Sequence, residues 1–498
     1  MGCREKTTHL DSARREIQMV RTFKASLVSF AVAAALAAPA AYATNGYFKI
    51  GYGTKNRGMA GAGIAYSQDS LAPATNPSGL SFVGNRVDFG VELFSPKREA
   101  QLDASAIGGT DTGKVDSGAT LFAIPHAGFA MDMGNITAGM SITANGGMNT
   151  RYNSNLFTDA FAPAIGCNGA AFCGGAPSGF AGMIVGMGGT VPDAVLQGIG
   201  SNPNLNPSLG VNLSQVIIAP TVSTKLSENH SVGGSLLIGY QRFRAYGLGL
   251  FQPLSSDPNS VTNNGDDDAW GAGLRVGWTG KVTDSLTLGA QASSKIYMQK
   301  FSDYEGLFAE QGDFDIPAQF GVGLAFTPTD KTTIAVDVQH IMYGDVDSIA
   351  NDGPTADEFF GALTEVLQSG AYTGAGRLGD DDGWGFGWDD ITVIKVGVNH
   401  RYNEKWTFRG GINYGENPID DDQNLFNILA PGVVQTHVTA GFTYHPSRYQ
   451  ELSVSYMHAL DNDQDHTFAG TGGFAGFSYD TEIGMYQNAL EISYGMKF

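Results

Sequence analysis

The feature that most constrains the fold is a two-residue alternation of apolar and polar side chains, which recurs from residue 86 onward. In segment 269–281, Trp270, Leu274 and Val276 share one face, whereas Arg275 lies on the other. A period of two indicates a β-strand. Segments of about ten residues with one apolar face are typical of strands that cross a membrane in a closed barrel. The pattern therefore predicts an all-β protein.

Fourteen such segments can be counted along the chain. They are 86–99, 119–132, 135–147, 214–226, 230–245, 269–281, 285–299, 315–327, 331–343, 390–402, 405–415, 434–446, 449–459 and 488–498. An even number suits a closed antiparallel barrel, in which every backbone group finds a partner inside the membrane. In segment 285–299, the alternation places Ile296 and Met298 on the apolar face and Tyr297 on the opposite face, toward the lumen.

The connections between these segments alternate in length. Short turns such as Val282–Asp284 and Asn403–Glu404 join alternate pairs, and long connections separate them, above all 148–213, 344–389 and 460–487. Outer-membrane barrels have short periplasmic turns and long extracellular loops. A water-soluble β-sandwich is the alternative, but it gives no reason for this strict alternation.

Composition excludes several other classes of protein. The net charge of −20 argues against nucleic-acid binding. Charged residues are 16% of the chain, too few for a disordered or coiled-coil protein. A mean hydropathy of −0.10 is too polar for a bundle of membrane helices. The 68 glycines suit an all-β protein, since they are about twice the usual share.

The first 43 residues read as an export signal with an N-terminal extension. Arg21 and Lys24 precede an apolar run that ends in Ala41-Tyr42-Ala43, which fits a secretory signal better than a membrane anchor. Residues 1–18 do not fit the front of a signal, so we expect the natural start at Met19. Cys167 and Cys173 remain in the exported chain, where such a pair predicts a local disulfide rather than a metal site.

The last strand ends at an aromatic residue. Residues 490–498 alternate apolar and polar side chains up to Phe498. This ending resembles the terminal signature of bacterial outer-membrane barrels, so we expect Phe498 to be read by the barrel-assembly machinery. The expected location is the outer membrane of a Gram-negative bacterium, in contact with its lipid and lipopolysaccharide.

Residues 44–85, ahead of the first strand, do not alternate. Gly58, Gly61 and Gly63 would let backbone segments approach closely, and Asn76-Pro77-Ser78 suits a helix cap followed by proline in the first turn. Such a segment could plug the barrel as a hatch. A periplasmic tail is the alternative reading of the composition.

These residues carry a specific resemblance. The runs Gly58–Gly63 and Ala74–Gly79, together with Asp69, resemble the front of the FadL/TodX family of outer-membrane transport proteins. The resemblance continues through 139–153 and 222–244 and closes at Phe498. The family usually has alanine where this chain has Ser78.

The resemblance implies a fourteen-stranded barrel, residues 86–498, whose lumen is blocked by an N-terminal hatch. It also implies a kinked third strand that opens a gap in the wall, and the kink maps to Asn145, Gly146 and Gly147. Paired glycines in a strand independently favour a bulge or a broken ladder. An ordinary bend into the next loop is the alternative.

The two longest loops, which we expect to be extracellular, are unusually apolar. Residues 355–370 of the second loop predict an amphipathic helix with a capping box at Thr355 and Glu358. Together the loops predict a capture site for hydrophobic molecules, formed by Leu156, Phe157, Phe161, Phe180, Ile184, Phe359, Phe360, Leu363 and Leu367. Packing of the loops on each other is the alternative.

Charged side chains are expected inside the barrel. Alternation places four cations there as candidate polar anchors for a ligand: Arg275, Lys295, Lys395 and Arg409. Five carboxylates share this face: Asp88, Glu92, Asp337, Glu451 and Glu491. Pairing of these charges with each other or with the hatch is the alternative. Acidic runs such as Asp420–Asp422 read as solvated loop tips, with calcium binding or bridging to lipopolysaccharide as the other reading.

These features predict a passive outer-membrane transporter of hydrophobic compounds, without enzymatic activity, cofactor or metal. Ligands would enter through the external loops and leave sideways at Asn145–Gly147. A water-filled general porin is the main alternative, and a barrel lipase or protease is a second. The sequence does not distinguish long-chain fatty acids from alkanes or aromatic hydrocarbons.

Overall fold

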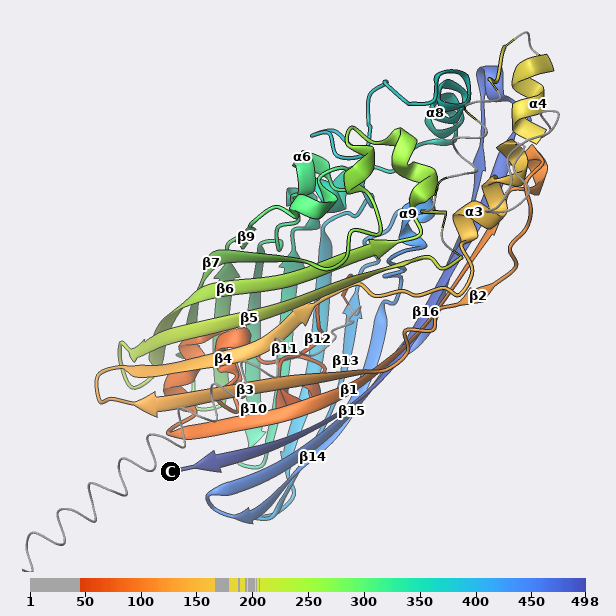
Figure 1. Ribbon diagram of the computed structural model, residues 1–498. Coiled ribbons are helices and arrows are strands. Elements are labelled where there is room, and N and C mark those ends of the chain that lie inside the picture. The colour runs from red at the N-terminus through yellow and green to blue at the C-terminus, as the bar shows by residue number, and fades with distance from the viewer. Residues whose placement is uncertain are drawn as a thin grey trace, which may run out of the picture.

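The computed structural model describes residues 45–165, 179–186, 189–192, 195, 202, 204–205 and 207–498. Its strands are β1 (Arg86–Asp103), β2 (Val115–Asp116), β3 (Phe122–Asp132), β4 (Thr137–Gly146), β5 (Gly210–Lys225), β6 (His230–Tyr246), β7 (Asp267–Lys281), β8 (Leu286–Ser293), β9 (Tyr297–Met298), β10 (Gln319–Thr329), β11 (Thr332–Ile341), β12 (Ile391–Arg401), β13 (Trp406–Gly415), β14 (Thr436–Ser447), β15 (Gln450–Ala469) and β16 (Ser478–Lys497). Apart from the two-residue strands β2 and β9, these are fourteen long strands. Because β1 pairs antiparallel with both β3 and β16, the sheet closes into a barrel (Figure 1). The predicted fourteen-stranded antiparallel β-barrel is confirmed.

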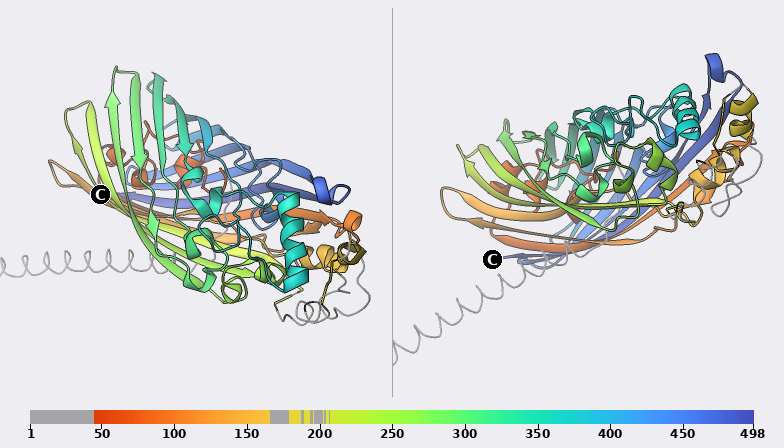
Figure 2. Two further views of the ribbon diagram at one scale, coloured as in Figure 1. Left: turned by 90° about the horizontal axis from the view of Figure 1, so that it is seen from above. Right: turned by 45° about the horizontal axis from the view of Figure 1, so that its top comes forward.

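The described helices are short, and most gather at one end of the barrel (Figures 1 and 2). The α-helices are α2 (Thr54–Arg57), α3 (Leu156–Phe161), α4 (Gly179–Gly186), α6 (Ala309–Gly312), α7 (Asp347–Ala350), α8 (Ala356–Ser369) and α9 (Asn424–Asn427). The 3₁₀ turns are η1 (Ala72–Ala74), η2 (Pro77–Phe82), η3 (Ser105–Ile107), η4 (Pro163–Ile165), η6 (Gly249–Leu254), η7 (Pro258–Ser260), η8 (Ser302–Tyr304), η9 (Tyr343–Asp345) and η10 (Gly472–Phe474). We call the end that carries α3, α4, α6, α8 and α9 the cap. Among the described residues, no helix combines the length and the apolar character needed to cross a membrane.

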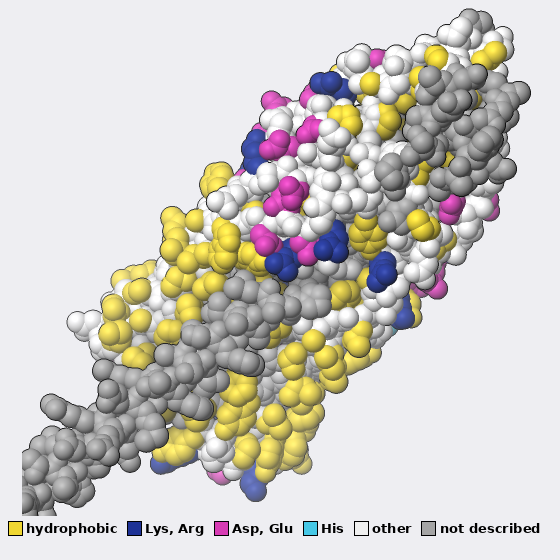
Figure 3. All heavy atoms as spheres, viewed as in Figure 1, with side chains coloured by type: hydrophobic (Ala, Val, Ile, Leu, Met, Phe, Trp, Pro, Cys, Tyr) yellow, Lys and Arg dark blue, Asp and Glu magenta, His cyan; other side chains and the backbone are white. Residues whose placement is uncertain are grey.

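The alternation of the strands corresponds to two faces of the wall. Leu274 and Val276 are 61% and 58% exposed, whereas Arg275 between them is 3% exposed. Figure 3 shows the result as a broad area of hydrophobic side chains over the strands, with acidic and basic side chains gathered toward the cap. Exposed apolar side chains on a closed barrel suit contact with lipid.

The predicted strand ends are close to the observed ones except in the last hairpin. The prediction that 460–487 is a long connection is wrong. Strand β15 continues to Ala469, and β16 already begins at Ser478. Residues 461–466 read Asp-Asn-Asp-Gln-Asp-His, with no apolar face to signal a strand. This part of the hairpin extends to the cap (Figure 1), so neither face has to meet lipid.

The alternation expected for 285–299 breaks after β8. Strand β7 pairs Arg275 with Ser293 but Gly271 with Met298, which leaves one extra residue in the second strand. A one-residue bulge moves every later side chain to the other face. Ile296 and Met298 are therefore buried and Tyr297 is 67% exposed, which corrects the predicted orientation of all three.

Residues 45–85, which we call the inner segment, lie inside the barrel, where Figures 1 and 2 show them in red, surrounded by strands. Buried ion pairs join this segment to one side of the wall. Arg57 lies 2.9 Å from Glu92 of β1 and 2.7 Å from Glu491 of β16. Lys49 lies 2.5 Å from Glu92, and Lys55 pairs with Glu451 of β15. Lumen carboxylates thus pair with this segment, which is the alternative that the sequence left open.

Polar contacts hold the opposite side of the inner segment. Asp337 of β11 accepts hydrogen bonds from the backbone N–H groups of Gly63 at 2.6 Å and Ile64 at 2.9 Å. Arg275 of β7 donates to the carbonyl oxygens of Pro73 and Ala74 at 3.0 and 2.6 Å. The inner segment is therefore fixed to strands on both sides of the lumen.

Two motifs of the expected hatch have clear structural roles. Asn76 caps η2, where its side chain accepts from Ser78 N at 3.1 Å, and its Nδ2 donates to Ile64 O at 2.8 Å. Pro77 follows as the first residue of that turn. Gly61 has a φ of +82°, and a Cβ there would lie 1.6 Å from Ile50 O, so no other residue fits without moving the backbone.

We expect Arg57→Met to loosen the inner segment, because it leaves Glu92 and Glu491 buried without the guanidinium between them. Breaking a buried pair costs about 3–5 kcal/mol. The measurement is urea unfolding, combined with amide hydrogen exchange of residues 45–85.

The matched control for this prediction is Lys114→Met. Lys114 pairs with Glu99 at 3.0 Å, but its side chain is 48% exposed. Exposed pairs contribute roughly 0–1 kcal/mol. Equal losses of stability in both variants would contradict the structural role given to Arg57.

Candidate functional site

The apolar side chains of the two long loops meet in the cap. Phe161 of α3 lies against Phe359 of α8 with ring centroids 5.1 Å apart, and Phe180 of α4 lies 5.4 Å from Phe360. Each of the expected capture residues is almost completely buried: Leu156, Phe157, Phe161, Phe180, Ile184, Phe359, Phe360, Leu363 and Leu367. Much of this surface is therefore used for packing of the loops on each other, as in the alternative reading.

Helix α8 forms as its sequence predicts. Thr355 Oγ1 accepts from Glu358 N at 3.3 Å, and Glu358 accepts from Thr355 N at 2.9 Å. Gly370 ends the helix with a φ of +91°. Asp357 accepts from Thr471 N at 2.7 Å, which ties the helix to the β15–β16 hairpin. The hydrogen bonds from the Thr471 hydroxyl and N–H lower the pKa of Asp357.

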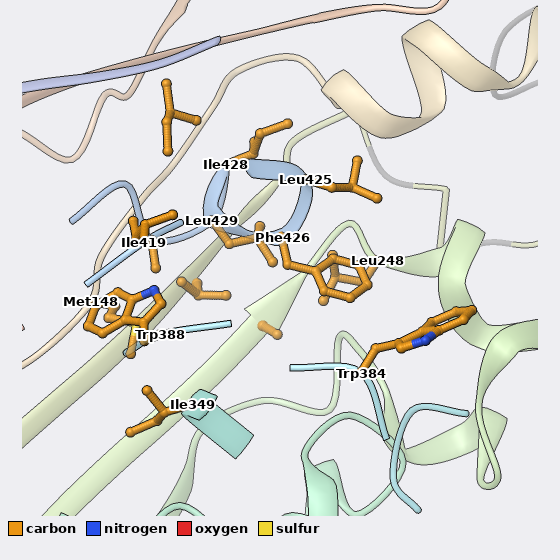
Figure 4. Packing of buried hydrophobic residues seen from close by; sticks show 14 of the residues in the cluster. Met148, Leu248, Ile349, Trp384, Trp388, Ile419, Leu425, Phe426, Ile428 and Leu429 are labelled. Atoms are coloured by element: carbon orange, nitrogen blue, oxygen red, sulfur yellow. The ribbon is translucent and has the colours of Figure 1, made fainter. Parts of the chain in front are cut away.

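Two apolar cavities remain within the packed cap, and the empty volumes given for them include open solvent. One has an empty volume of about 500 Å³ and lies between α3, η6 and α8, with Phe161, Phe359 and Leu363 in its lining. The other, of about 490 Å³, is lined by Leu248, Phe426 and other apolar side chains, and Figure 4 shows these two next to each other. Phe251 lines both cavities, so the two are neighbours.

An aromatic layer lies where the cap meets the inner segment. Tyr47 packs against Tyr343 and Trp388 with centroids 5.4 and 5.9 Å apart, and Phe48 packs against Tyr343 at 5.7 Å. Trp388 donates from its indole nitrogen to Asn427 at 2.7 Å. Residues at the start of the inner segment thus form part of the same apolar cluster as the cap.

The backbone pairing of the wall is interrupted beside this layer. The ladder between β3 and β4 runs only from Ala127–Ile142 to Asp132–Thr137. Within the described ladders, residues 122–126 of β3 pair with β1 and not with β4. On its other side, β4 has a register shift against β5 between Ala144 and Gly146. The register shift contains Asn145, one of the three predicted kink residues, whereas the ladder with β3 already ends at Ile142.

The inner segment bonds to the edge of β4 that is not paired with β3. Lys49 N donates to Asn145 O at 3.1 Å, and Gly147 N donates to Tyr47 O at 3.3 Å. A Cβ on Gly146 would lie 1.9 Å from Tyr47 O. Asn145 is fully buried, and its side chain bonds Gln215 at 3.0 Å and Tyr52 at 3.2 Å.

The four candidate lumen cations occupy different places. Arg275 and Lys395 both line a small polar cavity between the inner segment and the wall. Its empty volume, open solvent included, is about 300 Å³, and Lys395 bonds Gln339 there at 2.5 Å. Arg409 donates to Gln68 at 2.8 Å and to Thr443 at 2.7 Å. Lys295 bonds Asp345 O and lies 3.9 Å from Asp315, outside that cavity.

No sequence pattern marks the aromatic residues between the cap and the lumen. Tyr47, Tyr343 and Trp388 stand at or beyond the ends of alternating segments, so no strand pattern marks them. Large aromatic residues next to glycine-rich runs are the signal that could have drawn attention to them. Cys167, Cys173 and the export signal lie outside the described residues. In the described part of the chain, no group of three His, Cys, Asp or Glu side chains could hold a metal ion.

Barrel, inner segment and apolar cap define a membrane β-barrel with a filled lumen. A family model for outer membrane transport proteins (OMPP1/FadL/TodX) matches residues 208–495, so the chain belongs to that family. The family resemblance noted in the sequence is confirmed.

Known relatives agree with this assignment. A long-chain fatty acid transport protein of Escherichia coli is 32% identical over 98 residues, which are 19% of this chain and 21% of that protein. The chain thus matches about a fifth of the length of that relative. The toluene transporter TodX of Pseudomonas putida has a TM-score of 0.59 at 17% identity, with 90% of this chain and 99% of that one covered. A Pseudomonas aeruginosa FadL homologue has a TM-score of 0.60 at 13% identity, with 91% and 100% covered. These two likenesses show the fold.

We expect Gly146→Val to detach residues 47–49 from β4, because the added carbons would overlap Tyr47 O. Hydrogen exchange should accelerate at the amides of Lys49 and Gly147, both of which bond across this contact. The same substitution at Gly234, where the nearest atom to a Cβ is 4.0 Å away, is the control. Unchanged protection in the Gly146 variant would contradict the contact.

Proposed function

We propose that this protein carries hydrophobic compounds passively across the outer membrane. Long-chain fatty acids and related hydrocarbons are the substrate class. The observation that supports this most is the pair of apolar cavities in the cap, above a lumen filled by the inner segment. Ligand pockets for small hydrophobic molecules are lined mainly by apolar and aromatic side chains, as these two cavities are. The relatives named for fatty acids and toluene support the same class.

Capture begins in the cavity between α3 and α8. Phe161, Phe359 and Leu363 supply an apolar lining that an acyl chain or aromatic ring can share after leaving water. The ligand then passes Phe251, which lines both cavities, into the neighbouring cavity around Leu248 and Phe426. The aromatic layer of Tyr47, Tyr343 and Trp388 adjoins this second cavity, because Phe386 lines the cavity and lies 6.4 Å from Trp388 between ring centroids.

The inner segment acts as the hatch, and exit is lateral. Next to Tyr47, the missing β3–β4 pairing leaves a place where the wall holds no ladder hydrogen bonds. A displacement of residues 47–49 from Asn145–Gly147 would connect the aromatic layer with lipid. A hydrophobic molecule gains free energy by entering lipid rather than the periplasm. The concentration gradient drives this path, and no cofactor or catalytic group takes part.

A carboxylate on the substrate would find cations deeper in the lumen. Arg275 and Lys395 share the polar cavity beside the inner segment and are the candidate anchors for a fatty acid. Lys295 at the cap and Arg409 toward the other end are the other two candidates. A neutral hydrocarbon needs none of them.

The wall and the chain end indicate the remaining partners. The exposed apolar side chains of the strands contact outer-membrane lipid, and the charged cap reaches lipopolysaccharide. Phe498 ends the last strand as the residue that the barrel-assembly machinery reads.

Leu363→Trp tests the capture cavity. The larger side chain fills part of the space between α3 and α8, so we expect binding of a fluorescent fatty acid to weaken about tenfold, or about 1.4 kcal/mol. Leu226→Trp is the control, because Leu226 is 65% exposed and lies at the opposite end of the barrel. Equal affinity of both variants and the unchanged protein would argue against capture at this place.

Transport and conductance distinguish the proposal from a general porin. In cells lacking their own fatty acid transporter, the protein should restore uptake of a labelled long-chain fatty acid or of toluene. In planar bilayers it should pass almost no ions, because the inner segment fills the bore. High ion conductance without uptake would favour the water-filled porin and refute the proposal.

A further inference from the structure

A larger hollow lies at the end of the barrel opposite the cap. It has an empty volume of about 1460 Å³ that includes open solvent. Its lining comes from the β12–β13 and β14–β15 connections, the ends of the adjoining strands, and the lower side of the inner segment at Gln68. We call this hollow the basin. The short turns at this end place it on the periplasmic side.

Positive charge predominates in the basin, although the whole chain has a net charge of −20. Six cationic side chains line it: Lys55, Arg401, Lys405, Arg409, Arg448 and Lys497. The two carboxylates in the lining are Glu404 and Glu451. Glu451 is already paired with Lys55, with Arg86 at 2.7 Å and with Lys497 at 2.6 Å. Its negative charge is thus matched within the protein.

The other four cations, Arg401, Lys405, Arg409 and Arg448, form no ion pair with any described residue. Arg401 donates to Asp330 O at 3.3 Å, and the guanidinium of Arg448 lies 4.6 Å from the ring centre of Tyr449. Arg409 is held by Gln68 and Thr443. An arginine carries five N–H donors, so Arg401 keeps most of its donors available. Glu404 is the one lining carboxylate left to balance these four charges.

We propose that the basin binds the phosphate or carboxylate group of an anion at the periplasmic mouth of the barrel. A concave surface lined by one sign of charge concentrates counter-ions. Planar guanidinium groups suit the two oxygens of a carboxylate or phosphate. The site faces the periplasm below the inner segment, so an anion reaches it without passing the cap. The proposal is independent of transport through the wall.

The anionic group can belong to a free solute or to an amphiphile such as a lipid. In both cases Arg401, Lys405 and Arg448 supply the charge, because they lie on the turns and strand ends around the rim. Arg409 lies deeper and positions Gln68 of the inner segment, so it is left unchanged in the test.

Calorimetry on the purified full chain in a non-ionic detergent tests this site. The ligands are octyl phosphate, inorganic phosphate and, as the neutral comparison, octanol. The test variant is R401Q/K405Q/R448Q. The control variant R242Q/R244Q/K114Q removes three cations near the cap, where they pair with Asp268, Asp266 and Glu99. Both variants lose the same charge, so a general electrostatic effect cancels in the comparison.

We expect octyl phosphate to bind at least about tenfold more weakly to the basin variant than to the control, since three charge-assisted contacts are lost. Higher salt should weaken binding to the unchanged protein. Competition by inorganic phosphate would identify a free anion as sufficient, whereas a requirement for the octyl chain would identify an amphiphile. Equal affinities of the two variants, or octanol binding as tightly as octyl phosphate, would overturn the proposal. If the triple variant does not fold, Lys405→Gln alone should show a smaller loss in the same direction.

Discussion

Buried ion pairs between the inner segment and the wall are the interaction on which the rest of the structure depends. Lys49, Arg57, Glu92 and Glu491 lie almost entirely out of contact with solvent. Charges in such surroundings are tolerated only when they are paired and hydrogen-bonded. The carboxylates of β1 and β16 therefore require cations from residues 45–85, and this requirement keeps the lumen filled.

The inner segment that fills the lumen also borders the interruption in the β3–β4 ladder. The segment that carries Lys49 and Arg57 also supplies the backbone groups that bond Asn145 and Gly147. Movement of residues 47–49 would therefore also displace Lys49 from Glu92, which Arg57 shares. The aromatic side chains of Tyr47 and Phe48 connect the same short stretch to the apolar cap. In the proposed path, a ligand in the cap would lie close to residues 47–49, which border the missing β3–β4 pairing.

Much of the fold could be predicted because lipid imposes a simple rule on each strand. Leu274, Arg275 and Val276 show it: alternate side chains meet lipid and lumen. The rule fails where lipid is absent, as in residues 461–466, which form strand without an apolar face. It also fails at the bulge before Tyr297, because a single extra residue leaves no mark in the composition.

The site was harder to predict than the wall. The apolar character of 148–213 and 344–389 and the capping box at Thr355 pointed to the elements that meet in the cap. The sequence could not separate residues that only pack, such as Phe180, from those that line a cavity, such as Phe161 and Leu363. That distinction depends on tertiary contacts between loops far apart in the chain. The basin was missed for the same reason, since Arg401 and Arg448 belong to different turns.

The most direct measurement is a crystal structure of the protein grown with a brominated long-chain fatty acid, in which anomalous scattering locates the bromine. The account predicts bromine density in the cavity beside Phe161 and Leu363, or along the path from Leu248 to the β3–β4 interruption. Bromine found only in the detergent around the strands, together with an open water-filled bore, would contradict it.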